Sequence, residues 1–163
     1  MDYGGAGPNC TSSQVGPGED SSGIIPVMKR VAVAVIRHPE TGKFLLVSST
    51  KDFGEFTGFF YPPGGTVEPG EEEENTIRRE MLEELNLVVE PVRRIAQTPG
   101  DVADQETSWW ECRLVSGEMK PSDEVAQVGY FSREEMSAMS IWPATEAFFR
   151  EHIDAPRVAG ERE

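Results

Sequence analysis

The feature that most constrains this chain is one charged segment between residues 64 and 87, which reads GGTVEPGEEEENTIRREMLEELNL. From Glu72 to Leu85 its residues recur with helical spacing. Glu80, Glu83 and Glu84 fall within an arc of roughly 100° on such a helix. The opposite side collects the apolar residues Ile77, Met81, Leu82 and Leu85. The segment therefore predicts a helix with one face in the core and one acidic face.

The glutamates at the two ends of this helix differ in how easily they are explained. Glu71–Glu74 lie at its amino-terminal end, where unpaired N–H groups and the positive end of the helix dipole favour negative charge. Glu83 and Glu84 lie at the other end, where the dipole disfavours them, and each pairing with Glu80 costs about 0.2–0.5 kcal/mol. The segment contains no lysine. A bound hard divalent cation, which takes carboxylate oxygens as ligands, would compensate this charge.

The segment resembles the Nudix box, a fixed pattern of glycine, glutamate, arginine and further glutamates around a helix. The matching positions are Gly65, Glu71, Arg79, Glu80, Met81, Glu83, Glu84 and Leu87. One position departs from the pattern, because the glycine that follows the helix in the family is Asn86 here. Asparagine tolerates the left-handed conformation best after glycine, so we interpret the change as conservative.

This resemblance implies a fold and a chemistry. The fold is of the α/β class, an α/β/α sandwich with a mixed sheet, in which the box forms a loop-helix-loop at one end of the sheet. The reaction is hydrolysis of a nucleoside diphosphate linked to another group, by attack of water at phosphorus, with Mg²⁺ or Mn²⁺ as cofactor. Clustered carboxylates suit this chemistry, because the cations that they hold neutralise phosphate oxygens and help to deprotonate water.

Carried over position by position, the resemblance also implies roles for individual residues. Glu71 and Arg79 match a structural ion pair that holds the loop against the helix. Glu72–Glu74 are expected to be ordinary solvated side chains. The metal ligands, and with them the catalytic carboxylates, are matched by Glu80, Glu83, Glu84 and the backbone carbonyl of Gly64.

The general base is not assigned by the box. In the family it lies either within the helix or on a variable downstream loop. Glu124, just before an expected strand, is our downstream candidate for a catalytic base. Its rivals are the acidic residues Asp123, Asp101, Asp104 and Glu106.

Recognition of a base needs a flat apolar surface, which aromatic side chains provide. We take Tyr61 and Trp109 as candidates, and we expect Trp109 to be the better exposed because it alternates with Trp110 on the face of Glu111 and Arg113. The full aromatic set is Phe59, Phe60, Tyr61, Trp109 and Trp110. Arg37 is a candidate for holding phosphate or ribose, but spacing does not separate it from the other basic residues, which are Lys51, Arg93 and Arg94.

The rest of the chain predicts strands and helices without a βαβ repeat, which favours a mixed sheet with helices packed on it. The apolar run within Met28–Ile36 predicts a central strand, and Phe44–Ser48 is expected to return as its hairpin partner. Ser132 and Glu135 form a capping box, and Pro143 suits the first position of a last helix. Further strands are expected at 88–96, 109–114 and 125–131.

Length and charge limit the class of protein. At 163 residues the chain suits one domain, expected over residues 24–156 between a Gly/Ser/Pro-rich tail (1–23) and a charged tail (157–163). A net charge of -14 argues against nucleic acid and membrane partners, which leaves a small nucleotide derivative, and a homodimer is compatible with the sequence. The lack of a leader or long apolar run predicts a cytoplasmic protein. Cys10 and Cys112 indicate neither a disulfide nor a zinc site.

The sequence leaves three functional hypotheses. The first is a Mg²⁺-dependent diphosphohydrolase acting on a nucleoside triphosphate, an oxidised nucleotide, a nucleotide sugar or ADP-ribose, although Pro99 lies too close to the box to match the proline typical of ADP-ribose enzymes. The second, motivated by Asn86 and the long tail, is a non-catalytic Nudix domain that binds a nucleotide or a protein partner. The third is an isomerase of isoprenoid diphosphates, which would need metal-binding histidines beyond His38 and His152.

Overall fold

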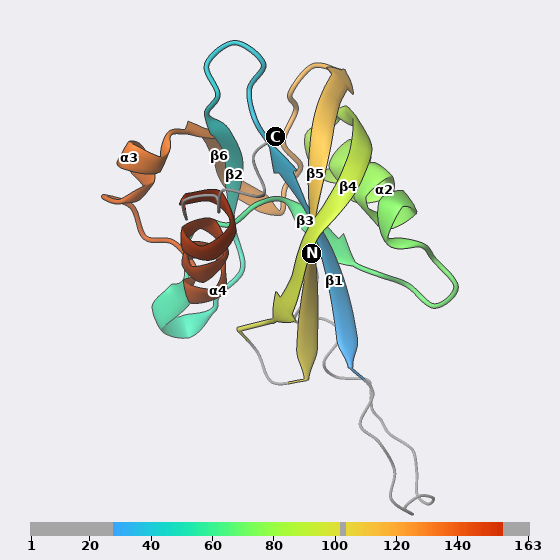
Figure 1. Cartoon of the computed structure of the whole chain (residues 1–163), viewed down its shortest axis with the longest axis horizontal. Helices are drawn as coiled ribbons and strands as arrows, with labels where there is room; N and C mark the ends of the chain where they lie inside the picture. Colours follow the sequence, from blue (N-terminus) through green and yellow to red (C-terminus); the bar gives the residue numbers. More distant parts are fainter. Residues whose placement is uncertain (1–27, 102–103, 155–163) are drawn as a thin grey trace, which may run out of the picture.

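The computed structural model describes residues 28–101 and 104–154, whose arrangement is shown in Figure 1. The expected tails at residues 1–23 and 157–163 lie outside the described residues. The strands are β1 (Lys29–Ile36), β2 (Phe44–Ser49), β3 (Gly64–Thr66), β4 (Val88–Pro99), β5 (Gln105–Ser116) and β6 (Val125–Phe131). The helical segments are η3 (Gly54–Phe56), α2 (Glu73–Leu85), α3 (Arg133–Met136), α4 (Pro143–Phe148) and the π-helical turn η4 (Phe149–Asp154).

Strand β1 lies inside a mixed four-stranded sheet with the order β3-β1-β5-β4. It runs antiparallel to β3 and parallel to β5, while β4 pairs antiparallel with β5 at the edge. Helix α2 and helix α4 lie on opposite sides of this sheet (Figure 1). The predicted α/β class with a mixed sheet between helices is therefore confirmed.

The side chains of β1 explain why this strand is apolar throughout. Ala32, Ala34 and Ile36 pack with the apolar face of α2, whereas the alternate valines pack with the end of α4. Since successive side chains of a strand point to opposite faces, covering both faces requires a continuous apolar run. The alternate set is Val31, Val33 and Val35. The prediction of a central strand is correct.

The expected hairpin between β1 and β2 is wrong. Strand β2 pairs antiparallel with β6 in a separate two-stranded sheet, and a single bridge between Arg37 and Phe44 links it to the end of β1. A strand has two edges for hydrogen bonding, and both edges of β1 are already occupied by β3 and β5. All six residues of β2 are nevertheless buried, because this strand lies between the two hydrophobic clusters.

Helix α2 begins and ends close to the predicted limits. Ile77, Met81 and Leu85 are fully buried, whereas Leu82, which we expected on the same face, is 53% exposed. Leu82 lies about 100° around the helix from Met81, which is enough to carry it past the contact with the sheet. Asn86 follows the helix in the left-handed conformation, with φ 61° and ψ 34°. Its backbone N–H donates to the carbonyl of Leu82, so it ends the helix as the missing glycine would.

The remaining predictions of secondary structure are largely correct. Strand β4 is an edge strand with an irregular register around Pro91. Ser132 and Glu135 form both hydrogen bonds of a capping box at α3, and Pro143 is the first residue of α4. Two strands are longer than the expected ranges 88–96 and 109–114, because β4 continues to Pro99 and β5 begins at Gln105.

We expect Asn86→Ala to lower the free energy of unfolding by about 1–3 kcal/mol. Holding alanine in the left-handed conformation costs about 1–2 kcal/mol. The substitution also removes the hydrogen bond from Asn86 Nδ2 to the Glu118 carbonyl, which is 2.9 Å long. Asn86→Gly should change stability much less, because glycine adopts this conformation freely. Urea unfolding measures both, with the exposed Asn75→Ala on the same helix as control. Wild-type stability in Asn86→Ala would contradict this role of the cap.

Candidate active site

An acidic recess lies beside the carboxyl-terminal half of α2. It brings together the predicted catalytic residues Glu80, Glu83, Glu84 and Glu124, although Glu124 is 40 or more residues further along the chain. Two backbone bonds hold the segment before β6 against the helix end, from Lys120 N–H to the Leu85 carbonyl (2.9 Å) and from Ser122 N–H to the Glu84 carbonyl (2.8 Å). The complete lining is Glu68, Arg79, Glu80, Glu83, Glu84, Ser122, Asp123 and Glu124.

The glutamates of α2 differ in burial. Glu80 and Glu84 are 9% and 6% exposed, while the side chain of Glu83 is 60% exposed. Burial, followed by the charge of Glu84, raises the pKa of Glu80 to about 7. A carboxylate that is both desolvated and next to a like charge resists ionisation. The recess therefore presents negative charge that the fold itself compensates only in part.

The glycine pair of β3 lets the backbone approach the acidic recess closely. A Cβ atom on Gly65 would occupy the position of the Glu80 carboxyl group, and one on Gly64 would collide with the Ala32 carbonyl and Val33. Gly64 thus leaves no room for a side chain against the backbone, whereas a side chain at position 65 would displace the carboxyl group of Glu80. Gly64 is absent from the recess lining described above, so its role as a carbonyl ligand stays a prediction.

Glu71 and Arg79 form the bidentate ion pair expected for this loop. Arg79 Nε and Nη2 each donate to one carboxylate oxygen of Glu71 at 2.8 Å, and Nη2 also donates to the Thr66 carbonyl at 3.3 Å. Glu71 further accepts from Thr76 Oγ1 (2.7 Å) and from the backbone N–H of Glu68 (3.1 Å). Chiefly because of the hydrogen bonds from Arg79, the pKa of Glu71 falls to about 2. The pair therefore joins β3, the loop and α2.

Glu73 is not the solvated side chain that we expected. It is 5% exposed and accepts hydrogen bonds from Arg30 (2.8 Å), Trp110 Nε1 (2.8 Å) and Ser108 Oγ (3.1 Å). Arg94 Nε lies 3.6 Å from the same carboxylate. Burial raises the pKa of Glu73, but these donors outweigh it and hold the pKa below its usual value. The sequence could not single it out, because its partners come from three separate strands.

The donor set of the recess suits a hard divalent cation. Carboxylate oxygens are the ligands that Mg²⁺ and Mn²⁺ prefer, and the paired burial of Glu80 and Glu84 is stabilised by added positive charge. Within residues 28–101 and 104–154, no three or more His, Cys, Asp or Glu side chains are gathered closely enough to form a ready metal site. The residues therefore fit the ion by chemistry and location, and their convergence on it would require side-chain adjustment.

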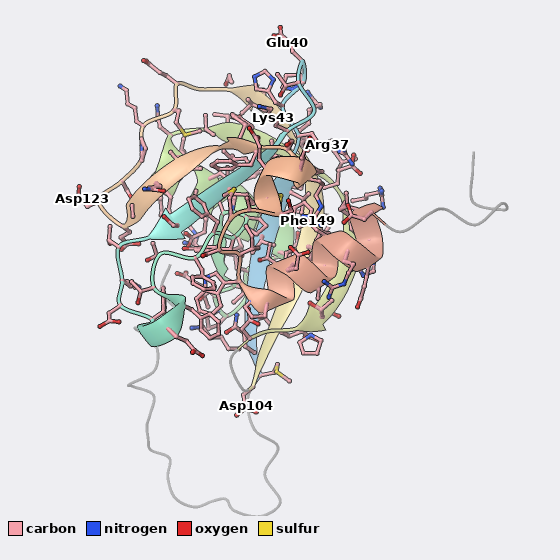
Figure 2. The ribbon with its side chains drawn as sticks, turned by 90° about the vertical axis from the view of Figure 1, so that its left-hand side faces the viewer. Arg37, Glu40, Lys43, Asp104, Asp123 and Phe149 are labelled. Atoms are coloured by element: carbon pink, nitrogen blue, oxygen red, sulfur yellow. The ribbon has the colours of Figure 1, made fainter. Side chains whose placement is uncertain are left out.

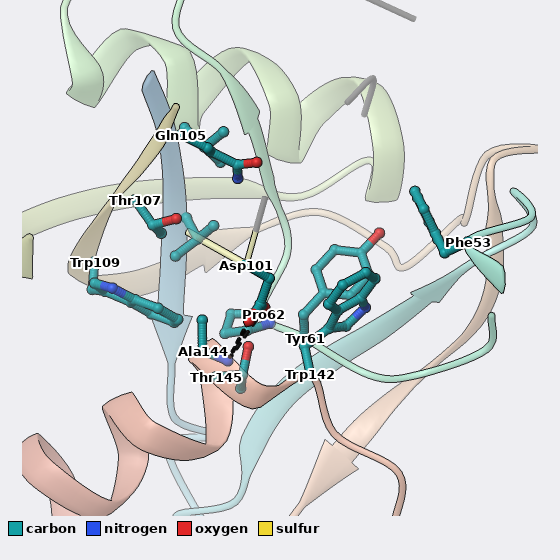
Figure 3. Close-up of a pocket in the computed structure, with 12 residues that line it drawn as sticks. Phe53, Tyr61, Pro62, Asp101, Gln105, Thr107, Trp109, Trp142, Ala144 and Thr145 are labelled. Carbon is teal, nitrogen blue, oxygen red and sulfur yellow. Dashed lines mark hydrogen bonds between the residues drawn. The ribbon is translucent and has the colours of Figure 1, made fainter. Parts of the chain in front are cut away.

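An aromatic cleft, open to solvent, lies on the side of the sheet that faces α4 (Figure 3). Trp142 forms one wall and stacks on Phe56, with 4.8 Å between ring centroids. The complete lining is Val31, Val33, Phe53, Tyr61, Pro62, Asp101, Gln105, Thr107, Trp109, Trp142, Ala144 and Thr145. The predicted candidates Tyr61 and Trp109 both belong to it.

Comparison with known protein families identifies the family of a chain that combines this acidic recess with this aromatic cleft. The model of the NUDIX domain matches residues 28–152. The chain belongs to the Nudix family. Together with the MutT-like structures below, this match confirms the predicted resemblance and makes the protein a MutT-like Nudix hydrolase.

Solved Nudix structures share this fold. The MutT protein of Methanosarcina mazei Go1 is 25% identical, with 80% of this chain and 96% of that protein covered and a TM-score of 0.66. The MutT Nudix hydrolase of Burkholderia pseudomallei is 21% identical, with coverage of 78% and 99% and a TM-score of 0.68. An ADP-ribose pyrophosphatase of Streptococcus suis 89-1591 is 23% identical, with coverage of 79% and 94% and a TM-score of 0.59. A comparison with curated proteins finds no match.

Trp109 is not the exposed platform that its alternation with Trp110 suggested. It is 2% exposed and stacks on Phe148 of α4, with ring centroids 4.1 Å apart and planes 4° from parallel. Its Nε1 donates to Thr98 Oγ1 at 2.8 Å. The prediction failed because α4 covers this face of β5, so that both faces are buried here. In the Nudix cleft Trp109 is a fixed wall.

Arg37 does not join either the acidic recess or the aromatic cleft. Its guanidinium lies 4.6 Å from the ring centroid of Phe44, and it lines a different groove with Val92 and Arg113. Figure 2 shows Arg37 near the β1–β2 turn, well apart from Asp123. Arg37 therefore lies apart from the recess and the cleft, just beyond the end of β1, and its contact with substrate stays a prediction.

The rival candidates for the general base are also separated by the fold. Asp123 lines the recess beside Glu124, whereas Asp101 lines the aromatic cleft. Asp104 and Glu106 are absent from the linings of both. Within the described residues, Glu124 and Asp123 are thus the downstream candidates that remain.

No helix within the described ranges is long and apolar enough to cross a membrane.

We expect Glu71→Gln to lower the free energy of unfolding by about 2–3 kcal/mol at pH 7, because the carboxyl pKa is about 2 in the folded protein against an ordinary 4.5. A depressed folded-state pKa gives stability that is present above the unfolded value and lost as pH falls through the folded value. The loss should therefore shrink to less than about half at pH 3. Urea unfolding at both pH values tests this.

The control for this variant is Glu72→Gln, whose side chain makes no capping hydrogen bond and is exposed. It should stay within about 0.5 kcal/mol of wild type at both pH values. If Glu71→Gln and Glu72→Gln unfold alike at pH 7, the ion pair does not hold the loop.

Proposed function

We propose that this Nudix protein is a divalent-metal-dependent diphosphohydrolase. Its substrate is a nucleoside diphosphate linked to another group, namely a nucleoside triphosphate, an oxidised nucleotide, a nucleotide sugar or ADP-ribose, and water attacks at phosphorus. The observation that carries the proposal is that the aromatic cleft and the acidic recess adjoin the same short segment, residues 62–65. Pro62 lines the aromatic cleft, while Gly65 contacts Glu80 of the acidic recess.

This spacing suits a nucleotide. Three residue steps separate Pro62 from Gly65, which corresponds to about 10 Å of extended chain at roughly 3.3 Å per residue. A nucleoside diphosphate is long enough to insert its base in the cleft and to extend its phosphates past the backbone of β3. The scissile anhydride then lies beside the recess. The aromatic walls bind the apolar ring faces, and the described lining residues of the cleft include no basic side chain to attract the phosphates.

The recess residues then have distinct tasks. Glu80, Glu83 and Glu84 would hold the cation, and the Gly64 carbonyl is a further ligand by family resemblance. When bound, Mg²⁺ or Mn²⁺ supplies charge neutralisation on the phosphate oxygens and lowers the pKa of a bound water. Glu124 accepts the proton of the attacking water. The ion pair described above keeps the backbone of β3 and helix α2 in register, which preserves the position of these groups.

Net charge supports dependence on a cation. The chain carries a formal charge of -14, and the recess combines the carboxylates of α2 with Asp123 and Glu124. A polyphosphate would be repelled from such a surface in water, since like charges at close range disfavour association. Binding therefore requires positive ions in the recess or on the substrate.

The relatives support the reaction class and leave the substrate open. One similar structure is described as an ADP-ribose pyrophosphatase and another as a UDP-X diphosphatase, at 23% and 18% identity. Both activities cleave a diphosphate linkage. At such identity the likeness to these two structures extends to the fold alone, so the reaction class rests on the family match and neither substrate is preferred here.

The non-catalytic alternative has lost its main motive. It was based on Asn86 in place of the glycine after the helix and on the long tail. Asn86 adopts the conformation that the glycine would supply, and the tail lies outside the described residues. The cytoplasmic location and a possible second subunit stay predictions.

The test is a panel of these four substrate classes with Mg²⁺ or Mn²⁺, in which chromatography follows the loss of substrate and the formation of nucleoside mono- or diphosphate. Glu84→Gln should reduce kcat/KM by at least about 100-fold, because one carboxylate is lost where charge must be neutralised. EDTA should abolish turnover and added Mg²⁺ should restore it. The matched control is Glu74→Gln, a substitution in the first turn of the same helix. No turnover of any substrate, or full activity in Glu84→Gln, would contradict the proposal.

A second prediction concerns the general base. Glu124→Gln should lower kcat by about 10²–10⁴-fold with little change in KM, and it should remove the acidic limb of the pH–rate profile. Asp123→Asn, at the neighbouring position of the same recess, is the control and should retain most activity. The reverse result would transfer the role to Asp123.

A further inference from the structure

We propose that a basic groove on the sheet binds the phosphate group of a small organic phosphate, at a site separate from the aromatic cleft and the acidic recess. The groove has a volume of about 440 Å³, which is typical of small-molecule sites. Its charged lining residues are Arg37, Arg93, Arg113 and Glu111. These four residues line neither the cleft nor the recess, so the inference goes beyond the proposed function.

The groove and the cleft occupy successive positions along β1. Val31 and Val33 line the cleft, whereas Val35 and Arg37 line the groove. Figure 2 shows Arg37 at one end of the molecule and Asp104, which directly precedes β5, at the other end. The described lining of the cleft contains no basic residue, while that of the groove contains three. The two hollows therefore suit different chemical groups.

Two of the arginines are neighbours across parallel strands. The pairing of β1 with β5 places Ile36 opposite Cys112. Continued by one residue, this register brings Arg37 beside Arg113, on backbones about 4.8 Å apart. Like charges at opposed positions of neighbouring strands are unfavourable. Within residues 28–101 and 104–154 neither arginine forms an ion pair, so their charges are available to a bound anion.

The other charges of the groove leave it positive. Arg93 Nε lies 2.9 Å from a carboxylate oxygen of Glu111, and the two side chains are 63% and 46% exposed, so solvent weakens this pair. The guanidinium of Arg37 lies 4.6 Å from the ring centroid of Phe44, which helps to orient it. Three guanidinium groups against one carboxylate give the groove a net charge of +2, in a chain whose formal charge is -14.

A phosphate group on a small molecule fits this groove best. Each planar guanidinium can donate two hydrogen bonds to one phosphate, whose three terminal oxygens allow Arg37 and Arg113 to bind it together. A carboxylate has only two oxygens and serves two such forks less well. Val35, Ile95 and Ile153 line the same groove and supply apolar contact for an organic group. The acidic remainder of the chain repels long polyanions, which limits the ligand to a small one.

The experiment measures binding of phenyl phosphate to the full chain by calorimetry in the presence of EDTA. EDTA removes the cations that phosphate binding in the recess would need. Wild type should bind with a Kd below about 10 mM. Arg37→Gln and Arg113→Gln should each weaken binding by about tenfold or more, because charge-assisted hydrogen bonds to the phosphate are lost. Benzoate, which keeps the ring and replaces the phosphate by a carboxylate, should bind at least about fivefold more weakly than phenyl phosphate.

The matched control is Arg150→Gln, which removes the same charge from an exposed arginine that does not line the groove. It should bind phenyl phosphate within about twofold of wild type. Melting temperature separates ligand binding from a structural role. Without ligand, Arg113→Gln should melt no lower than wild type, because repulsion from Arg37 is relieved. Saturating phenyl phosphate should raise the melting temperature of wild type and Arg150→Gln but not that of Arg113→Gln.

Three results would overturn the phosphate site: no saturable binding by wild type, unchanged affinity in Arg113→Gln, or an equal loss of affinity in Arg150→Gln. Self-association of wild type that Arg113→Gln abolishes would assign the groove to a second copy of this chain and would also overturn the proposal. The assay needs neither a cation nor hydrolysis. Loss of the groove site therefore leaves the diphosphohydrolase untouched, and a chain without turnover can still show the groove site.

Discussion

The close approach of the Glu80 carboxyl group to the backbone of β3 is the constraint on which the site depends. Gly65 leaves no room there for a side chain, and the resulting burial desolvates a carboxylate that already lies beside Glu84. Arg79 donates to Glu80 at 3.0 Å, but the same guanidinium is engaged in a bidentate pair with Glu71. Charge on the recess is thus only partly compensated, and packing of the apolar face of α2 against the sheet stabilises an arrangement that electrostatics alone would disfavour.

Local features of the site could be read from the sequence because their causes are local. The helical spacing of Ile77 and Met81 identified α2, and the tolerance of Asn86 for positive φ explained how the helix ends. The pair Glu71–Arg79 followed from a spacing that the family fixes. Glu124 was predicted only as a downstream candidate for the base. It lies in the recess because the bonds to the last carbonyls of α2 come from the few residues that precede it, and its role as the base stays a prediction.

The failures have a common physical origin in contacts between distant elements. Alternation along β5 described its two faces correctly, but it could not show that α4 would cover the face of Trp109. The four consecutive glutamates after Gly70 gave no sign that Glu73 alone would be buried and bonded to Arg30 and Trp110, because these two partners come from distant strands. Asp101 was considered only as an acid near the reaction, because its neighbour Ala144 lies 43 residues away in sequence. A pattern of residues indicates which face of an element is buried, but it does not indicate which distant element packs on that face.

At the end of α2, the same residues that hydrogen-bond the last helical carbonyls also position the candidate base. Its last turn, which lies wholly in the described part, contains no basic residue. The carbonyls of Glu84 and Leu85 instead accept from backbone N–H groups of the segment that carries Glu124. Basic side chains would satisfy the same carbonyls but would also neutralise the negative end of the helix dipole. Neutral N–H donors satisfy these carbonyls and keep the negative electrostatic potential at the helix end. The end of α2 that positions the candidate base therefore also attracts a cation.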